Sequence, residues 1–538
     1  MKRSIYGNTP FVQRVYQKLV SQRLETAYYK KFFEQTFKRN DSNRKILIYA
    51  GIGKMFLTPV EILLYHLLKE NGFEVEYYIY NEEIPINELI TKKVIEQKGK
   101  EDFWKNNVSK AKEILTASKV KYSFITPDPA VYEVVNSLPN NDLDAILNFE
   151  YEGIGFGEIV EGVMYRYYKS LQFDEDAYDV AKKFLHTALI NYFQIRNLHE
   201  KKAFNYVLFS HGIYCTWQPI VEYCRKEGIN FICYDRAKTK GHCNFNLNRP
   251  SPVWDFRESW VRLKNHSLSE EEEQKVDAYL RQRILQKGDV FSYNFSGRAK
   301  DLSRVKEQLR IKEGSTVVTF FTNLIWDAAN VSRDIAFKSP IECIVDTIKT
   351  LKIQNNIHFL VRIHPAEKVL GTEGRYGELV VNAFNRKIPE NVTIINPDDN
   401  INSFDVLDIS DIGVVHTSTV GLEMAIAEKP VILISDTHYR GKGFTYDAQN
   451  RKNYFEIIDK LISEPSPLPD QKHLSRKYFY LMMFEYQHQM PMSYTKSNLF
   501  NGYGYYSYDE LKKDSDAPIN KIIRRISGEE PFADFIFK

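Results

Sequence analysis

The chain of 538 residues is too long for one hydrophobic core, because cores stop growing at roughly 250 to 300 residues, so two domains are expected. Its hydrophobic fraction of 43% and charged fraction of 27% are ordinary for a globular protein and exclude a disordered or fibrous class. A net charge of +3 excludes a surface that is basic throughout, so we expect no nucleic-acid partner.

The N-terminal segment is locally basic. Residues 1–44 hold ten Lys or Arg residues against three acidic ones, and the pattern predicts a helical extension. This excess could attract an anionic membrane surface; a solvated helix face is the alternative interpretation. The sequence has no apolar run of roughly 18 residues and begins without the apolar core of a signal peptide. We therefore expect a cytoplasmic protein with at most a peripheral contact with the inner membrane.

Residues 45–313 are predicted to form a Rossmann-like acceptor domain that ends in a helical connector. Lys45–Ala50 and Glu74–Tyr80 are β-rich runs on either side of the helical segment Pro59–Asn71, which is a βαβ pattern. The later elements of this domain are predicted as strands at Tyr122–Ile125, Ala145–Phe149, Tyr206–Ser210 and Asn230–Tyr234, a long helix through about Leu198, a helix at Gln218–Lys226, and charged helices over 251–313.

Residues 314–450 repeat the alternation and are predicted to form a Rossmann-like domain that binds a nucleotide sugar. Its expected elements are strands at Thr316–Phe321, His358–Ile363, Thr393–Ile395, Ile412–Val415 and Val431–Ile434, with helices at Ile341–Leu351 and Val420–Glu428. Such alternation builds parallel sheets covered on both faces. The expected fold is thus α/β, with two Rossmann-like domains facing a cleft, an N-terminal helical extension, and a Tyr-rich C-terminal one (451–538) that returns to the first domain.

The polar motifs follow strand ends, where open α/β sheets bind ligands. In Arg362-Ile363-His364-Pro365 the histidine is held by the following proline and can donate to a phosphate or a base carbonyl. Arg362 can fork onto phosphate oxygens. A loop histidine before a helix-starting proline is the alternative interpretation.

The second motif covers residues 414–434. His416, Thr417, Ser418 and Thr419 offer hydroxyl and N–H groups at a helix start, which is a favoured geometry for an anion. Glu423 lies one turn into the helix, where its carboxylate can accept two ribose hydroxyls. Simple helix capping is the alternative interpretation.

The third motif, residues 320–330, follows the first strand of the second domain. Thr322 and Asn323 suit a phosphate-contacting turn, and Trp326 and Asp327 can stack or hydrogen-bond at the cleft. A core tryptophan followed by a helix-capping aspartate fits the same residues equally well.

The first domain must supply any catalytic base. His211 follows a strand, and a neutral histidine suits deprotonation of an acceptor hydroxyl near neutral pH. Glu152 and Glu158, with Glu150, lie in a glycine-rich segment that we interpret as a flexible loop, and they are the rival bases. Asp235 and Arg236 after the next strand form a weaker option.

These motifs together resemble those of bacterial capsule polysaccharide biosynthesis glycosyltransferases of GT-B type. The resemblance rests on SHGIY with EGINFICYD, on FTNLIWDA, on RIHP and on HTSTVGLEMAIAEKPV, and it covers about residues 45–450. It implies transfer of a sugar from a UDP- or CMP-linked donor to an oligosaccharide or lipid-linked glycan of a capsule or O-antigen. His364 would then contact donor phosphate or base, Ser418 and Thr419 the phosphate, and Glu423 the ribose.

The resemblance further implies a reaction without a metal held by a DxD motif and without a cofactor, the nucleotide sugar being a substrate. We expect activity to persist in EDTA. A sugar-nucleotide 2-epimerase, a polyol-phosphate polymerase of teichoic-acid type and a non-catalytic scaffold of polysaccharide assembly remain as alternatives. Product analysis with donor alone separates an epimerase from a transferase, because an epimerase needs no acceptor.

Overall fold

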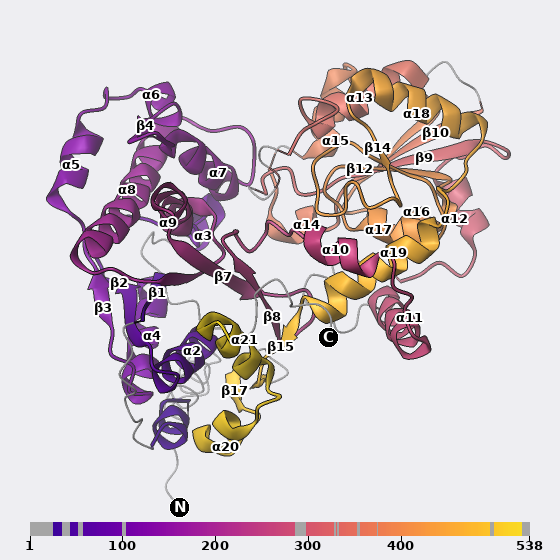
Figure 1. Cartoon of the computed structure of the whole chain (residues 1–538). Coiled ribbons are helices and arrows are strands. Elements are labelled where there is room, and N and C mark those ends of the chain that lie inside the picture. Colours follow the sequence, from indigo (N-terminus) through magenta and orange to yellow (C-terminus); the bar gives the residue numbers. More distant parts are fainter. Residues whose placement is uncertain are drawn as a thin grey trace, which may run out of the picture.

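The computed structural model describes residues 25–34, 44–51, 57–98, 104–285, 297–327, 330, 333–351, 356–373, 375–494 and 500–529. It has two lobes, each built on its own sheet (Figure 1). Most of the basic segment 1–44 lies outside the described residues; residues 25–32 form a helix. No helix of the described part is both long and apolar enough to cross a bilayer.

The first lobe contains a seven-stranded sheet in the order β15-β8-β7-β6-β1-β2-β3. The strands are β1 (Lys45–Gly51), β2 (Glu74–Tyr80), β3 (Ser123–Ile125), β6 (Tyr206–Ser210), β7 (Asn230–Arg236), β8 (His242–Leu247) and β15 (His488–Gln489). The strands from β7 to β3 are parallel, whereas β8 and β15 add antiparallel pairings at one edge. The predicted βαβ opening is confirmed, with α2 (Thr58–Glu70) between β1 and β2.

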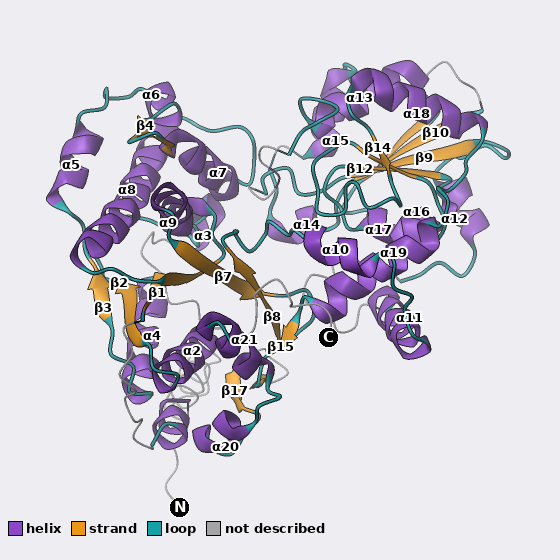
Figure 2. Ribbon diagram, viewed as in Figure 1, coloured by secondary structure: helices purple, strands orange, loops and turns teal. Residues whose placement is uncertain are grey.

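Helices cover both faces of this sheet (Figure 2). Besides α2, the helices described in this lobe are α3 (Lys92–Lys98), α4 (Lys105–Ala117), α5 (Pro129–Asn136), α6 (Leu143–Leu147), α7 (Phe156–Tyr168), α8 (Ala177–Lys201) and α9 (Tyr214–Glu227). A short hairpin of β4 (Glu150–Tyr151) and β5 (Ile154–Gly155) lies before α7. The strand predicted at Ala145–Phe149 is wrong. Asp142 caps a helix there by accepting the Ala145 N–H, and this local bond favours helix over strand.

The second lobe holds a six-stranded parallel sheet in the order β11-β10-β9-β12-β13-β14. The strands are β9 (Thr316–Phe321), β10 (Ile357–Arg362), β11 (Val392–Ile395), β12 (Ile412–Val415), β13 (Val431–Leu433) and β14 (Tyr446–Asp447). Its helices are α13 (Pro340–Leu351), α14 (Ala366–Leu370), α15 (Tyr376–Ala383), α16 (Ser403–Ile409), α17 (Val420–Ile426) and α18 (Arg451–Ser463). The expected α/β fold with two Rossmann-like domains facing a cleft is confirmed.

The connector helices pack on the second lobe. They are α10 (Arg257–Leu263), α11 (Glu270–Ile284) and α12 (Leu302–Gln308). Trp260, Val276 and Val305 from these helices share one core with Val415 of β12 and Phe479 of α19 (Gln471–Tyr480). The connector, which the sequence groups with residues 45–313, therefore contributes to the core of the second lobe, because its apolar side chains face that sheet.

The C-terminal segment crosses back to the first lobe, as expected. A π-helical turn (Leu481–Glu485) follows α19, and β15 then pairs with β8. Beyond it come β16 (Met492–Tyr494), β17 (Phe500–Tyr503), α20 (Tyr508–Lys513) and α21 (Pro518–Ser527), which are partly strand although helix was predicted. Tyr503 is buried against Phe32 of the N-terminal helix, with 4.7 Å between ring centroids. The chain thus passes between the lobes twice, before α10 and before β15.

Gly157 marks a close approach of α7 to α6. A Cβ atom at this position would lie 2.0 Å from the Leu147 carbonyl oxygen. Helix propensity alone makes Gly→Ala stabilising by about 1 kcal/mol, but overpacking against backbone typically costs about 1–3 kcal/mol and sometimes more. We expect Gly157→Ala to lower the free energy of unfolding by about 2 kcal/mol, measured by urea denaturation.

Gly155→Ala is the matched control, because its Cβ would meet only the Glu158 side chain at 3.8 Å. Equal stability of both variants would contradict the close packing of α6 and α7. The glycine-rich segment Glu150–Glu158, interpreted from the sequence as a flexible loop, instead forms the β4–β5 hairpin and the start of α7.

Candidate active site

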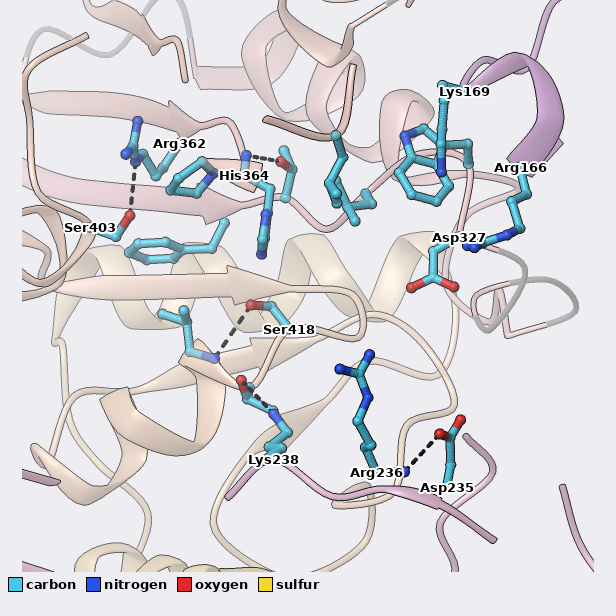
Figure 3. A pocket seen from close by; sticks show the side chains of 18 of the residues that line it. Arg166, Lys169, Asp235, Arg236, Lys238, Asp327, Arg362, His364, Ser403 and Ser418 are labelled. Atoms are coloured by element: carbon cyan, nitrogen blue, oxygen red, sulfur yellow. Dashed lines mark hydrogen bonds between the residues drawn. The ribbon is translucent and has the colours of Figure 1, made fainter. Parts of the chain in front are cut away.

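A cleft of about 790 Å³ lies between the lobes, which is within the range of about 300–1,000 Å³ that is usual for small-molecule sites. Its wall contains side chains from both lobes, several of which Figure 3 shows, and Arg283 from α11. The cations in this wall are Arg166, Lys169, Arg236, Lys238, Arg283 and Arg362, and the carboxylates are Glu88, Asp235, Asp327 and Glu423. His211, Thr322, Asp327, Arg362, His364, Pro365, Ser418, Thr419 and Glu423, all predicted from the sequence, line this one cleft.

His364 follows the carboxyl end of β10 and faces the cleft. Its backbone N–H donates to Thr322 Oγ1 at 2.9 Å, and its Nδ1 accepts the Ala366 N–H at 3.1 Å. Burial, with Arg362 and Lys238 nearby, lowers the pKa of His364 to about 4. The ring is therefore neutral near pH 7 and carries its proton on Nε2, which makes Nε2 a hydrogen-bond donor.

Arg362 points into the second lobe. Its guanidinium donates to Ser403 Oγ, Asn396 O and Ile401 O at 3.0–3.1 Å. These three bonds fix the loop before α16, so Arg362 stabilises this part of the cleft wall. The predicted fork onto a phosphate would require it to leave this loop.

The turn before α17 brings cations together from separate segments. Lys238 Nζ, from the loop after β7, lies 3.4 Å from Thr419 Oγ1. Arg283 Nη2, from α11, lies 3.5 Å from the same oxygen. Ser418 beside it also lines the cleft. Two positive charges thus meet two hydroxyl groups at one point of the cleft.

Glu423 is buried in α17 and forms an ion pair with Arg283. The helix has only seven residues, Val420–Ile426. An anion at this point would therefore depend on the side chains of Lys238, Arg283 and Ser418 more than on the helix start. A ribose at Glu423 would share its carboxylate with Arg283.

The third motif divides between cleft and core. Thr322 and Asp327 line the cleft, whereas Asn323 is buried, with its Oδ1 3.5 Å from the Tyr376 hydroxyl. Trp326 also lines the cleft, although it is only 4% exposed, and it donates from Nε1 to Thr372 Oγ1. Its ring lies under Lys169 Nζ, 3.2 Å from the ring centroid, which is a cation–π contact between the lobes.

His416 and Thr417 do not line the cleft. His416 Nε2 lies 3.0 Å from Asp334 Oδ1, and Thr417 Oγ1 donates to Asn330 Oδ1 at 2.6 Å. The two bonds connect the residues after β12 to Asp334 and Asn330. The structure therefore gives these two residues contacts inside the second lobe.

His211 lies at the carboxyl end of β6 with its Nδ1 hydrogen-bonded to Asp235 of β7. Its φ of +68° is left-handed, a conformation that costs a non-glycine residue energy and often marks functional sites. The next residue, Gly212, leaves no room for a side chain, because a Cβ would lie 2.8 Å from Pro250 Cα. Asp235 keeps the proton on Nδ1, which leaves Nε2 as a proton acceptor.

The rival carboxylates lie elsewhere. Glu152 pairs with Arg196 and Lys226 at 2.7 and 2.9 Å, and Tyr192 donates to it at 2.8 Å. Lys226 and Tyr192 help to lower the pKa of Glu152 and so favour its ionised form. Glu158 is exposed on α7. Neither residue lines the cleft.

Sequence reasoning missed five charged residues of the cleft wall. Glu88, Arg166 and Lys169 come from the first lobe, Lys238 from the loop after β7, and Arg283 from α11. None of them stands in a motif. Lys238 follows Asp235 and Arg236 by two residues, so an extension of that candidate could have included it.

Glu367 of α14 is a buried carboxyl group near the cleft wall. Within the described part of the chain neither of its side-chain oxygens has a hydrogen-bond partner. Burial raises the pKa of Glu367 to about 8, with Arg375 opposing and Glu378 adding to the shift. Burial thus favours the protonated form of Glu367 in the folded protein.

No protein-family model and no curated protein matches the chain. Among solved structures it is similar to the β-Kdo 2,4-transferase KpsC of Thermosulfurimonas dismutans, at 13% identity and a TM-score of 0.36 over 54% of this chain and 82% of that one. It is also similar to the UDP-GlcNAc 2-epimerase of Neisseria meningitidis, at 11% identity and a TM-score of 0.25 over 80% and 94%. Similarities this distant leave the reaction open.

Proposed function

We propose that the protein is a glycosyltransferase that moves a sugar from a nucleotide-sugar donor to a hydroxyl of a surface polysaccharide acceptor. The observation that supports this proposal is that a candidate catalytic base and a candidate phosphate-binding group of residues line the same cleft. The first lobe offers a histidine oriented by an aspartate, His211 and Asp235. The second lobe offers the hydrogen-bond donors Ser418 and His364, and Lys238 and Arg283 place positive charge beside them.

The donor phosphates would lie at the turn before α17. Lys238 and Arg283 supply positive charge there, and His364 Nε2–H and the Ser418 hydroxyl supply donors. These groups stabilise the charge that develops on the leaving phosphate, which is the task that a metal performs in other transferases. Apolar wall residues, Phe321, Pro365, Phe404 and Leu407, would flank the nucleoside.

In the transfer step, the acceptor oxygen forms a bond to the anomeric carbon while the bond from that carbon to the phosphate oxygen breaks. The hydroxyl proton passes to His211 Nε2, and the electron pair of the broken bond leaves with the nucleoside phosphate. Asp235 stabilises the imidazolium that forms. The step consumes only donor and acceptor.

His364→Ala and Lys238→Ala test the donor site. Hydrogen bonds to charged groups contribute about 1.5–3 kcal/mol, so each variant should bind UDP or CMP about tenfold or more weakly in calorimetry. Because the pKa of His364 is about 4, its contribution should not change between pH 6 and 8.

Lys240→Ala is the matched control, since Lys240 is exposed two residues along the same loop and does not line the cleft. Wild-type affinity in both His364→Ala and Lys238→Ala would reject the donor site. Conversion of a nucleotide sugar in the absence of any acceptor would instead favour the epimerase.

A further inference from the structure

The first-lobe end of the cleft has an arrangement that the donor site does not use. Its wall consists of Glu88, Asn107, Arg166, Lys169 and Tyr214, and we call it the first-lobe subsite. Arg166 and Lys169 come from the end of α7, and Tyr214 begins α9. In Figure 3, Arg166 and Lys169 lie on the side of the cleft opposite Arg362 and Ser403.

Arg166 is held in a fixed orientation. Its Nε donates to the Glu88 backbone oxygen at 2.8 Å, and the guanidinium carbon lies 5.3 Å from the Tyr214 ring centroid. Among the described residues no carboxylate lies within ion-pair distance of Arg166. An arginine anchored through Nε presents its two terminal nitrogens as a fork that fits a carboxylate or phosphate.

Glu88 is buried, 2% exposed, and lines the same subsite. One carboxylate oxygen accepts the Thr216 hydroxyl at 2.6 Å. The other, Oε1, is buried and has no hydrogen-bond partner in the described part of the chain. An unsatisfied buried acceptor costs about 1–3 kcal/mol, so a ligand that donates a hydrogen bond here gains affinity.

Lys169 adds a second cation to the subsite. Its ammonium group contacts the Trp326 ring and, like Arg166, has no ion pair within the described residues. Burial, together with Arg166, lowers the pKa of Lys169 to about 6, although Asp327 opposes the shift. Two cations beside each other in a walled cleft are destabilised, and a bound anion relieves this cost.

We propose that the first-lobe subsite binds an acidic sugar residue of the acceptor, with its anionic group on the Arg166 fork and a neighbouring hydroxyl donating to Glu88 Oε1. This inference rests on the proposed transferase function, because it assigns the acceptor to the lobe that holds His211. A sugar that carries one anionic group among hydroxyls matches a subsite with both an arginine fork and an open carboxylate oxygen. A neutral sugar would leave the Arg166 guanidinium without an anionic partner.

The test uses two glycosides that differ only at C6. Methyl β-glucuronide and methyl β-glucoside are titrated into the full chain with saturating UDP or CMP, and binding is followed by saturation-transfer NMR. We expect the glucuronide to bind at least about tenfold more tightly. Methyl glucoside 6-phosphate is the third probe, and tighter binding of it would identify phosphate as the anionic group.

Substitutions in the subsite test which residues cause the difference in affinity between the two glycosides. Arg166→Gln should abolish the preference for the glucuronide, whereas Glu88→Gln should weaken both glycosides alike. Arg225→Gln is the control, because Arg225 is an exposed arginine of the same lobe that does not line the cleft. Thermal melting confirms that each variant is folded.

Equal affinity of the wild type for the two methyl glycosides, no binding of either, or a preference that survives in Arg166→Gln would overturn the proposal. Nucleotide affinity, measured in parallel, should be unchanged in Arg166→Gln. If the wild type did not bind UDP or CMP, the proposed donor site would be rejected, but the two glycosides could still be compared. Failure of the proposed function and failure of the subsite proposal are therefore distinguishable. A preference of the wild type for UDP-glucuronate over UDP-glucose, without any for the methyl glycosides, would assign the subsite to the donor and overturn the proposal.

Discussion

Asp235→Asn is expected to lower the turnover number by about 10²–10⁴-fold, the usual contribution of general base catalysis. Asp235 hydrogen-bonds His211 Nδ1, so its carboxylate keeps the ring proton on the far nitrogen and leaves Nε2 able to accept. An amide can donate to Nδ1 and stabilise the opposite tautomer. Single-turnover kinetics with a fixed donor would measure the loss, and His211→Ala should show a loss of similar size.

Affinity for UDP or CMP should stay at its wild-type value in both variants, because the proposed donor site does not include His211 or Asp235. Glu158→Gln is the control for the rival base. Glu158 is exposed and does not line the cleft, so its replacement should leave turnover unchanged. A strong loss in Glu158→Gln with little loss in Asp235→Asn would reassign the base.

Glu367→Gln is expected to remove a pH-dependent loss of stability. The unfolded carboxyl ionises near pH 4.5 and the folded one near pH 8, so the native state binds more protons between these values. The ionisation of Glu367 therefore costs nothing below pH 4.5 and lowers the free energy of unfolding progressively as the pH rises to 8, by up to about 5 kcal/mol in total. Denaturant unfolding of the variant from pH 5 to 8 should show a flatter profile than that of the wild type.

Glu373→Gln, an exposed neighbour, should keep the wild-type profile. Identical profiles for wild type and Glu367→Gln would show that the Glu367 carboxyl is ionised or hydrated in the folded state. Asp and Glu groups elsewhere also titrate in the folded protein, so only the difference between the two proteins is informative.

The strands of both sheets could be predicted because their apolar runs are short and end at glycine or polar residues. Thr316–Phe321 and Ile412–Val415 agree with β9 and β12 to the residue. The strand predicted at Ala145–Phe149 overlaps the helix Leu143–Leu147, because a helix of five residues shows no helical period; the Asp142 cap is the local signal that distinguishes them. The pairs β4–β5 and β16–β17 are too short to give any periodicity.

The second-lobe side of the site was predictable because parallel strands bring their carboxyl ends to one edge. Thr322, His364 and Ser418 follow three strands that are neighbours in the sheet, β9, β10 and β12. Arg283 could not be found this way, since α11 reaches the cleft only through the packing of the connector. Lys238 lies two residues beyond the end of β7, just outside the strand-end candidate Asp235 and Arg236. Neither residue belongs to a sequence motif, and both lie in polar segments that are typical of a solvent-exposed surface.

The double passage of the chain between the lobes restricts how the cleft can open. A single linker would let one half swivel in any direction relative to the other. Two backbone connections, one before α10 and one before β15, define a line, and rotation about that line is the movement that stretches neither of them. Opening and closing of the cleft would then be a hinge rotation of one lobe relative to the other about this single axis.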